Sequence, residues 1–424
     1  MTQPLDLMTA IDRALCANPK TGLAWANIKA AAAAVGVSKS AYLPTLSASS
    51  QYMRQHVRTS VEEQAGLDSS YTEGVNSEAL SLSWVLYDFG ARSADVDNSR
   101  ALLDAARFSD DVALQSEFAT VAQDYYAAQS AAANVDATRD MEQAAARSLD
   151  AASVRVARGV APISDQLQAD TAHAQAAYQK SKADDDYRTA VGTLAIDMNL
   201  PPDTVLELPK LDSDRMPLKE TGTVIHDLIA EALSSHPSVK VAEAQWQAAL
   251  AKIRSIRAQG LPTLSAVGQF SYSDQPISAS LGQPELPAAT RDGYVGVKLS
   301  IPLFEGFGRS YQLRQAQAQA EAQDDTLRDV KQQVAVAVWS SYQSLQAATD
   351  NMHSSQTVLH CAHDAFEASQ HRYESGVGSV VELLSVQSAL SAAQQQDTQA
   401  QADWQTARIR LAESLGTLKP LAAE

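Results

Sequence analysis

The sequence predicts an α+β membrane protein in which long α-helical hairpins form a barrel continuous with a transmembrane β-barrel, with four strands per protomer and twelve in a trimer. Three observations predict this fold. The chain carries an internal tandem repeat, each copy has two segments in which apolar and polar residues alternate, and each copy has a proline-free helical tract several times longer than an average helix.

The internal repeat is visible as two stretches that recur with the same or nearly the same letters. Residues 43–48 read LPTLSA, and residues 261–266 read the same. Residues 86–92 read LYDFGAR and are matched by LFEGFGR at 303–309. Two matches at a shared offset of about 217 residues rarely arise by chance, and they indicate a duplicated structural unit.

The repeat sets the predicted organisation of the chain. The first repeat covers 1–200 and the second covers 223–424, and a proline-rich equatorial linker at 201–222 joins them. Asn199 and Gly416 occupy equivalent places near the two ends, and both residue types accept the left-handed conformation that finishes a helix. Each repeat is therefore predicted to end in a helix.

Each repeat is predicted to contain the same elements in the same order: a helix, a pair of strands, a long helix, a tip turn and a return helix. In the first repeat the helix covers 5–40, the strands 44–58 and 76–88, the long helix 91–157 and the return helix 164–198. In the second repeat the corresponding ranges are 223–259, 263–274 and 293–304, 309–374, and 379–416. Polar loops at 58–75 and 274–292 would connect the paired strands.

The strands are predicted from two-residue alternation, which places every second side chain on one face of a sheet. The apolar series are Leu80, Leu82, Trp84 and Leu86; Leu264, Ala266, Phe270 and Tyr272; and Val295, Val297, Leu299 and Ile301. Each strand is near the roughly 9–11 residues that cross a bilayer when tilted. Four strands cannot close a barrel, because about eight already leave only enough room for side chains. Three copies would supply twelve strands and leave no open sheet edge.

Composition and charge exclude several other classes. The chain has 424 residues and a formal net charge of −17, so it lacks the basic surface that nucleic-acid binding needs. No run of roughly 18 apolar residues predicts a membrane-spanning helix. HExxH, GxSxG, P-loop and dinucleotide-binding motifs are missing from the sequence, so we predict neither an enzyme nor a cofactor. The segment that begins at Met1 has no secretory leader, and we expect that a leader has been removed.

The double repeat, the LPTLSA and LFEGFGR segments and the glycine-valine turns resemble the TolC-type outer-membrane efflux family, the outer-membrane factors of tripartite efflux and type I secretion systems. The resemblance covers essentially the whole chain. It implies a homotrimeric exit duct in the outer membrane of a Gram-negative bacterium, surrounded by outer-membrane lipid and extending into the periplasm. Cargo would arrive from an inner-membrane RND or ABC transporter through a periplasmic adaptor (membrane fusion) protein.

Two kinds of alternative stay open at this point. Within the duct class, export of drugs, metals or proteins would use the same tube. A different class is a soluble coiled-coil scaffold, because long helices rich in Ala and Gln occur there as well. A requirement for detergent would separate the scaffold from the duct.

The resemblance also implies roles for the two tip turns. Residues expected to dock the adaptor are Arg158, Gly159, Val160, Ala161 and Pro162 in the first turn, and Arg372, Ser375, Gly376, Val377, Gly378 and Ser379 in the second. Glu382 and Asp165 would form rings of negative charge at the entrance, and Tyr373 would reach toward Asp165 as part of a closing latch. Gly378 stands where some family members carry a basic residue, and Ser385 stands where they carry a second acid.

Histidines and cysteines suggest no further chemistry. One predicted helix carries His353, His360, His363 and His371, which we interpret as a solvated face and not as a metal site. Cys16 and Cys361 would lie tens of Å apart by helical rise, so we predict no disulfide.

Overall fold

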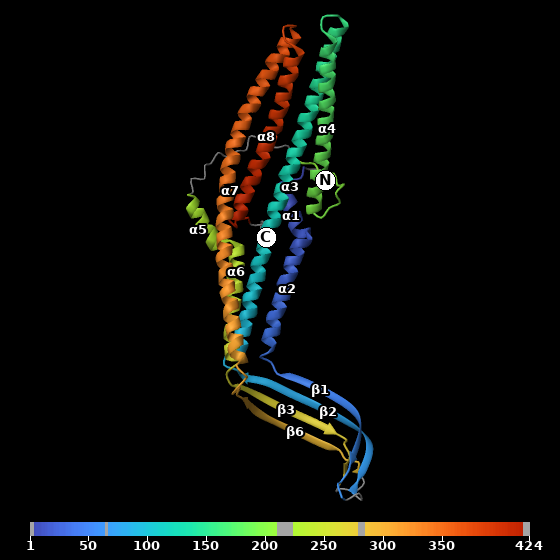
Figure 1. Ribbon diagram of the computed structural model, residues 1–424, viewed down its shortest axis with the longest axis vertical. Helices are drawn as coiled ribbons and strands as arrows, with labels where there is room; N and C mark the ends of the chain where they lie inside the picture. Colours follow the sequence, from blue (N-terminus) through green and yellow to red (C-terminus); the bar gives the residue numbers. More distant parts are fainter. Residues whose placement is uncertain (1–3, 64–66, 210–223, 279–284, 419–424) are drawn as a thin grey trace. The chain divides into compact units, whose positions relative to one another are not determined.

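A computed structural model describes residues 4–63, 67–209, 224–278 and 285–418 (Figure 1). The helices of the first repeat are α1 (Leu7–Ala17), α2 (Pro19–Ser40), α3 (Ala91–Ala157) and α4 (Ile163–Asp197). Those of the second are α5 (Ile225–Ser235), α6 (Pro237–Ala258), α7 (Gly308–Glu374) and α8 (Val380–Ser414). The strands are β1 (Thr45–Thr59), β2 (Ser69–Tyr87), β3 (Thr263–Ser273), β4 (Ile277–Ser278), β5 (Glu285–Leu286) and β6 (Thr290–Ser300).

The long helices have the same length in both repeats. Helices α3 and α7 each contain 67 residues, and α4 and α8 each contain 35. All four end in the same way, because the second residue after each helix has a positive φ: +69° at Gly159, +55° at Asn199, +80° at Gly376 and +69° at Gly416. No helix within the described residues is both long and apolar enough to cross a membrane.

The first predicted helix of each repeat is in fact two helices. Residues 5–40 form α1 and α2, and residues 223–259 contain α5 and α6. The breaks fall at Asn18 and His236, whose backbones are extended (ψ 132° and 128°). The reason is the proline that follows each of them, because proline disfavours helical geometry in the residue before it and is itself suited to the first turn of a new helix.

Two of the four long strands differ from their predicted ranges by more than one residue at an end. Strand β2 begins at Ser69 and not at 76, because its polar first half pairs with β1 from Thr59↔Ser69 onward. Backbone pairing therefore extends beyond the apolar alternation that marked the strand. Strand β6 ends at Ser300 and not at 304, and the predicted loop at 274–292 contains the short pair β4 and β5, with residues 279–284 outside the described part.

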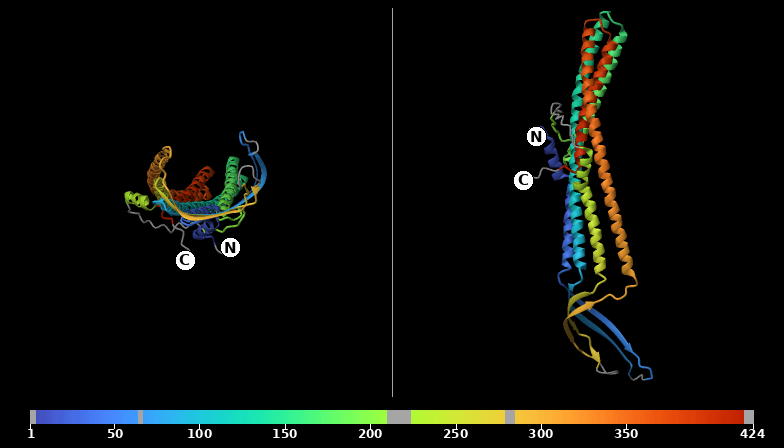
Figure 2. Two further views of the ribbon diagram at one scale, coloured as in Figure 1. Left: turned by 90° about the horizontal axis from the view of Figure 1, so that it is seen from below. Right: turned by 90° about the vertical axis from the view of Figure 1, so that its left-hand side faces the viewer.

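The four long strands form one antiparallel sheet in the order β1-β2-β3-β6. Figure 2 shows them side by side in a curved layer. The register brings apolar residues into rows across the sheet, because directly paired residues share a face. These rows are Leu46–Leu82–Gly268–Val295, Ala48–Leu80–Phe270–Gly293 and Trp84–Ala266–Val297. The opposite face has polar rows such as Ser47–Ser81–Gln269–Tyr294. The sheet thus has one apolar and one largely polar face.

The chain divides into two compact units that do not coincide with the sequence repeats. One unit contains residues 1–28, 106–242 and 327–424, and the other contains 29–105 and 243–326. Each unit draws on both repeats. Of the predicted linker at 201–222, residues 210–222 lie outside the described residues.

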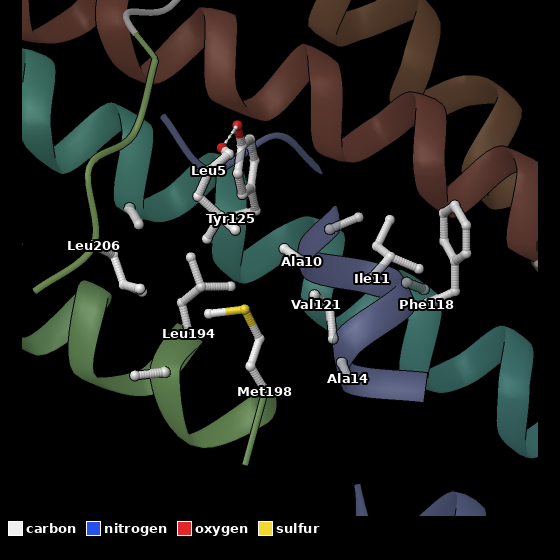
Figure 3. Close-up of a cluster of buried hydrophobic side chains, with 14 of the residues drawn as sticks. Leu5, Ala10, Ile11, Ala14, Phe118, Val121, Tyr125, Leu194, Met198 and Leu206 are labelled. Carbon is white, nitrogen blue, oxygen red and sulfur yellow. Dashed lines mark hydrogen bonds between the residues drawn. The ribbon is translucent and has the colours of Figure 1, made fainter. Parts of the chain in front are cut away.

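The first of these units has its main apolar core around α1. Figure 3 shows side chains of α1, α3 and α4 pointing toward one another in this core. Its most deeply buried members include Ala10, Ile11, Ala14, Val121, Ala122, Leu194 and Met198. The Tyr125 hydroxyl donates a hydrogen bond of 2.8 Å to the Leu5 carbonyl, so the phenol is satisfied inside the core. This core fixes the end of α4 against α1 and α3.

Candidate entrance and docking site at the helix turns

The turn from α3 to α4 closes with a Schellman motif. The Gly159 N–H donates to the Val156 carbonyl (2.9 Å), and the Val160 N–H donates to the Arg155 carbonyl (3.0 Å). Gly159 has a φ of +69°, a conformation that costs a residue with a Cβ about 1–2 kcal/mol. The space around it is open, so the backbone conformation and not crowding calls for glycine there.

The turn from α7 to α8 repeats this motif and is tighter. The Gly376 N–H donates to the Tyr373 carbonyl (3.0 Å), and the Val377 N–H donates to the Arg372 carbonyl (3.1 Å). The Gly378 N–H reaches the same Arg372 carbonyl at 3.0 Å. A Cβ on Gly378 would lie 2.9 Å from the Tyr373 nitrogen, so this turn has no room for a larger residue at that position.

The two return helices begin differently. At the start of α8, the Ser379 hydroxyl accepts a hydrogen bond from the Glu382 N–H (3.1 Å), which is a side-chain N-cap. At the start of α4, Pro162 provides no side-chain cap, and Asp165 supplies the negative charge in the first turn. Both acids lie where the helix dipole favours a carboxylate.

Apolar side chains are exposed around both turns. Val160, Ile163 and Val381 are 66%, 60% and 58% exposed, and Val377 is 72% exposed. Ala161 of the same region is half-buried, whereas Arg158 and Ser375 are exposed. Exposed apolar groups gathered at one place on a surface are typical of a protein-binding site.

Tyr373 is buried beside the second turn and contacts the first repeat. Its side chain is 5% exposed and packs in a cluster with Val380 and Leu383. The Arg155 guanidinium lies 4.9 Å from the centre of the Tyr373 ring, and its Nη1 donates to the Tyr373 carbonyl at 3.3 Å. Among the described residues, the structure joins Tyr373 to Arg155 and shows no hydrogen bond from Tyr373 to Asp165.

Arg155 is a functional candidate that the sequence reasoning missed. It lies four residues before Gly159, as Arg372 lies four residues before Gly376. The internal repeat therefore contained the signal. The contact of Arg155 with Tyr373 is known only from the structure, because residue spacing along α3 or α7 does not show which side chains of the two helices meet.

The predicted entrance acids have different surroundings. A carboxylate oxygen of Glu382 lies 3.6 Å from Nε of Arg372 across the second turn, with both side chains partly exposed. The nearest recorded side-chain partner of Asp165 is the hydroxyl of Ser164, at 3.5 Å. Arg372 therefore offsets part of the charge of Glu382, whereas Asp165 has no cation partner recorded within the described residues. Exposed ion pairs of this kind contribute only about 0–1 kcal/mol to stability.

Three of the α7 histidines, His360, His363 and His371, each lie beside one carboxylate of the same helix. His360 lies 3.7 Å from Asp364, and His363 lies 4.0 Å from Glu367, in each case one helical turn away. Within the described ranges, no three side chains of the metal-binding types come close enough to hold an ion. Cys16 and Cys361 are both free and exposed.

Comparison with known proteins identifies the family. The model of the outer membrane efflux protein family matches residues 10–196 and 228–417, so both repeats are recognised. The chain belongs to this family. It is an outer-membrane channel of the TolC type, a transport protein and not an enzyme, and the soluble scaffold is excluded. Channels of this type form trimers and work with efflux or secretion systems.

Individual relatives align with this chain over nearly its whole length. The chain is 31% identical over 419 residues to Protein CyaE of Bordetella pertussis, covering 98% of this chain and 84% of the relative. It is 23% identical to the outer membrane protein TolC of Escherichia coli, covering 99% and 83%. Among solved structures, the outer-membrane channel OprN aligns with a TM-score of 0.80 at 18% identity, covering 97% and 90% of the two chains. VceC from Vibrio cholerae aligns with a TM-score of 0.79 at 18% identity, covering 97% and 96%. The predicted fold class is confirmed.

Proposed function

We propose that three copies of this chain form a passive duct through which cargo, delivered by an inner-membrane transporter and a periplasmic adaptor, leaves the cell. The observation that carries this proposal is the four-stranded sheet. Strands β1 and β6 are its two edges, so each has one side whose backbone groups lack a strand partner within the described residues. In lipid such edges must be paired, and pairing β6 of one copy with β1 of the next would close twelve strands into a barrel.

The two faces of the sheet suit such a barrel. The apolar rows would face lipid, and the rows with Ser47, Ser81 and Gln269 would line water. Val295, Val297 and Leu299 of β6 are 88%, 67% and 60% exposed in the single chain, which leaves them available to lipid. Outer-membrane lipid is thus the partner of the apolar face.

The ends of the strands fit a membrane boundary. A shift of register between Val85 and Tyr87 pairs Tyr87 with Leu264 and so turns its ring to the apolar face. Tyr87 packs edge-on against Phe89 (4.8 Å), as Phe304 packs against Phe307 in the second repeat (5.6 Å). Aromatic side chains of barrels gather at the lipid headgroups. Both repeats therefore provide an aromatic pair at this level.

Ion pairs hold these aromatic turns in place. Phe89 and Phe307 have φ of +51° and +63°, which is unfavourable for residues with a side chain. The flanking pairs are Asp88–Arg92 at 2.8 Å and Glu305–Arg309 at 2.6 Å, each one helical turn apart. Asp88 also accepts hydrogen bonds from the Gly90 and Arg92 N–H groups. These contacts offset the cost of the left-handed phenylalanines.

The helix turns would receive the adaptor. Arg158 to Pro162 and Arg372 to Ser379 combine exposed valines with arginine side chains, the mixture that a protein partner could cover. Glu382 and Asp165 would form threefold rings at the entrance and favour cations. Because Arg372 lies beside Glu382, the preference for cations should be modest. Tyr373 and Arg155 would hold the two helical hairpins together near this entrance.

The partner determines what passes through the duct. Relatives include the pyoverdine export outer membrane protein OpmQ of Pseudomonas aeruginosa, at 27% identity over 430 residues, as well as CyaE and TolC. We propose an RND or ABC transporter as the source of cargo, which would be small molecules or a secreted protein. The chain itself would contribute passage and docking.

The trimer is tested by the mass of the protein in detergent. Light scattering should give three times the 45.3 kDa of one chain after the detergent mass is subtracted. A monomer or dimer would contradict the closed barrel. Photo-crosslinking from positions 160 and 377 in cells should capture an adaptor, and the lipid-facing position 297 serves as the matched control. Equal adaptor capture from all three positions would contradict the docking role.

A further inference from the structure

The helix breaks at Asn18 and His236 are built alike but from different side chains. The Asn18 side-chain oxygen accepts a hydrogen bond from the Lys20 N–H at 2.9 Å, and Nδ1 of His236 accepts one from the Ser238 N–H at 3.2 Å. In both cases the residue before a proline caps the following helix, because its side chain accepts a hydrogen bond from the N–H of the residue two positions later. Such N-caps contribute about 1 kcal/mol.

The two caps differ in their response to protons. A neutral imidazole has one nitrogen that can accept a hydrogen bond, whereas both nitrogens of a protonated imidazole are donors. Protonation would therefore break the bond from the Ser238 N–H. It would also place a positive charge at a helix N-terminus, where the helix dipole opposes it. The amide of Asn18 does not titrate in this range.

We propose that His236 is a proton-sensitive cap that releases the start of α6 at mildly acidic pH, while the equivalent start of α2, capped by Asn18, is not released. The proposal concerns this helix joint alone and does not depend on how the channel is assembled or what it carries.

The surroundings of His236 make the imidazole part of a packed joint. A Cβ added to Gly416, after α8, would lie 3.1 Å from Cα and 3.2 Å from Cδ2 of His236, so the end of α8 lies against this residue. A pocket of about 420 Å³ opens beside it. The pocket is lined by Val112, Gln115 and Ser116 of α3, Ala337 and Ser341 of α7, Arg410, Glu413 and Ser414 of α8, and His236 and Ser238.

The charged groups that face this pocket are Arg410 and Glu413 of α8, and on α6 itself Lys240 lies over the Phe108 ring at 5.7 Å. Burial lowers the pKa of His236, and a hydrogen bond with the backbone of Glu413 opposes that effect. Burial raises the pKa of the Glu413 carboxyl, against the attraction of Arg410.

The sign of the effect follows from these directions. The folded chain binds a proton at His236 less tightly than the unfolded chain does. The stability that this group contributes to the folded state is therefore full above pH 6.5 and is lost as the pH falls through the lowered pKa of the folded chain. Protonation would therefore weaken the first turn of α6. The second repeat would then open locally at a pH where the first repeat stays closed.

Hydrogen exchange on the full-length protein in detergent micelles tests this proposal. Protection factors of the amides in 238–242, corrected for intrinsic exchange, should fall about fivefold between pH 7.5 and 5.0 in the wild-type chain. The variant His236→Asn, which copies the cap of the first repeat, should keep its protection. The same pH dependence in wild type and His236→Asn would overturn the proposal.

The first repeat provides a reciprocal test. The variant Asn18→His should make the amides at 20–24 lose protection as the pH falls over the same interval, whereas those of wild type should lose none, because protonation of Asp197 stabilises the folded chain. This variant keeps the proposal testable if His236→Asn fails to fold. Unchanged pH dependence at 20–24 in a folded Asn18→His variant would also contradict the proposal, because the imidazole would then not act as a titratable cap in this geometry.

Discussion

The joint of the first repeat is buried and acidic, whereas the joint of the second repeat contains a histidine and is more open. Around Asn18, the Glu117 side chain is 2% exposed, accepts a hydrogen bond from the Asn18 amide and pairs with Lys20 at 3.1 Å. Around His236, the charged neighbours are Arg410 and Glu413. The two joints have the same extended backbone conformation, a proline at the same position and an equivalent cap. Duplication therefore preserved the geometry, whereas the side chains give each joint its own response to burial and pH.

The largest expected effect comes from the unequal burial of α1 and α5. Ile11 is 0% exposed, whereas its counterpart Ile229 is only partly buried. Ile11→Ala should lower the free energy of unfolding by about 2–5 kcal/mol, because it leaves a cavity in the core around α1. Ile229→Ala should cost less than half as much. Urea unfolding of both variants in detergent measures the difference, and equal losses would mean that α5 is as buried as α1 in the assembled protein.

The next effect concerns Asp197, in the acidic joint of the first repeat. Burial, a hydrogen bond with Asp124 and the charges of Asp124 and Glu117 raise the pKa of Asp197 from 3.8 to about 7, with Lys20 opposing. The folded chain therefore binds this proton more tightly than the unfolded chain, so the stability that the group contributes is full below pH 3.8 and is lost as the pH rises through about 7.

Replacement of Asp197 by Asn imitates the neutral carboxyl and should remove this pH dependence. At pH 8 the variant should be more stable than wild type by about 1–2 kcal/mol, a figure reduced for partial solvent screening. At pH 4 the two should agree. Thermal unfolding across this interval checks the prediction, and a destabilised variant at pH 8 would show that the charged form of Asp197 is the one that the fold favours. The stability contributed by Asp197 falls as the pH rises, which is opposite to the change expected for His236.

The two turns differ at the position after the valine. Gly378 has no room for a Cβ, whereas its counterpart Ala161 already carries one. Gly378→Ala should cost about 1–2 kcal/mol of stability, because the Tyr373 backbone must shift, and should weaken adaptor capture at position 377. Ala161→Gly is the matched control and should change stability by less than about 1 kcal/mol. Equal effects of the two substitutions would show that the second turn is no tighter than the first.

The smallest expected effect is on ion selectivity. Glu382→Ala should shift the zero-current potential of single channels toward lower cation preference, and Arg372→Gln should shift it the other way, because Arg372 offsets the charge of Glu382. Each shift should be a few millivolts in a salt gradient and should diminish at high ionic strength. Shifts of the same sign for both variants would contradict the paired arrangement.

The sequence was sufficient for the features that rest on periodicity and repetition. Proline-free tracts predicted α3 and α7, and two-residue alternation predicted the apolar rows that the register of the sheet now shows. Equivalent residues in two copies also predicted the left-handed ends at Asn199 and Gly416. These features depend on local geometry, which is why they can be inferred without a structure.

The features that the sequence did not reveal depend on contacts across the chain or on a single local residue. Pro19 and Pro237 divide the first helix of each repeat, a local effect that the alanine-rich composition obscured. The polar half of β2 is a strand because β1 pairs with it, and Arg155 is important because it reaches Tyr373. The repeat marks the position of Arg155, but neither composition nor spacing shows which residues such side chains or strands contact.

The central claim is that the polar face of the sheet lines a water-filled passage closed by three copies. Reconstitution of the purified protein into planar bilayers, with its mass in detergent measured on the same sample, tests this claim most directly. A trimer that gives discrete, cation-preferring conductance steps is the predicted result. A trimer without conductance could reflect a closed entrance, so the same recordings are made with Arg155→Ala, which removes the contact between the hairpins and should open it. A silent bilayer with both proteins, or a chain that stays monomeric in detergent, would contradict the account.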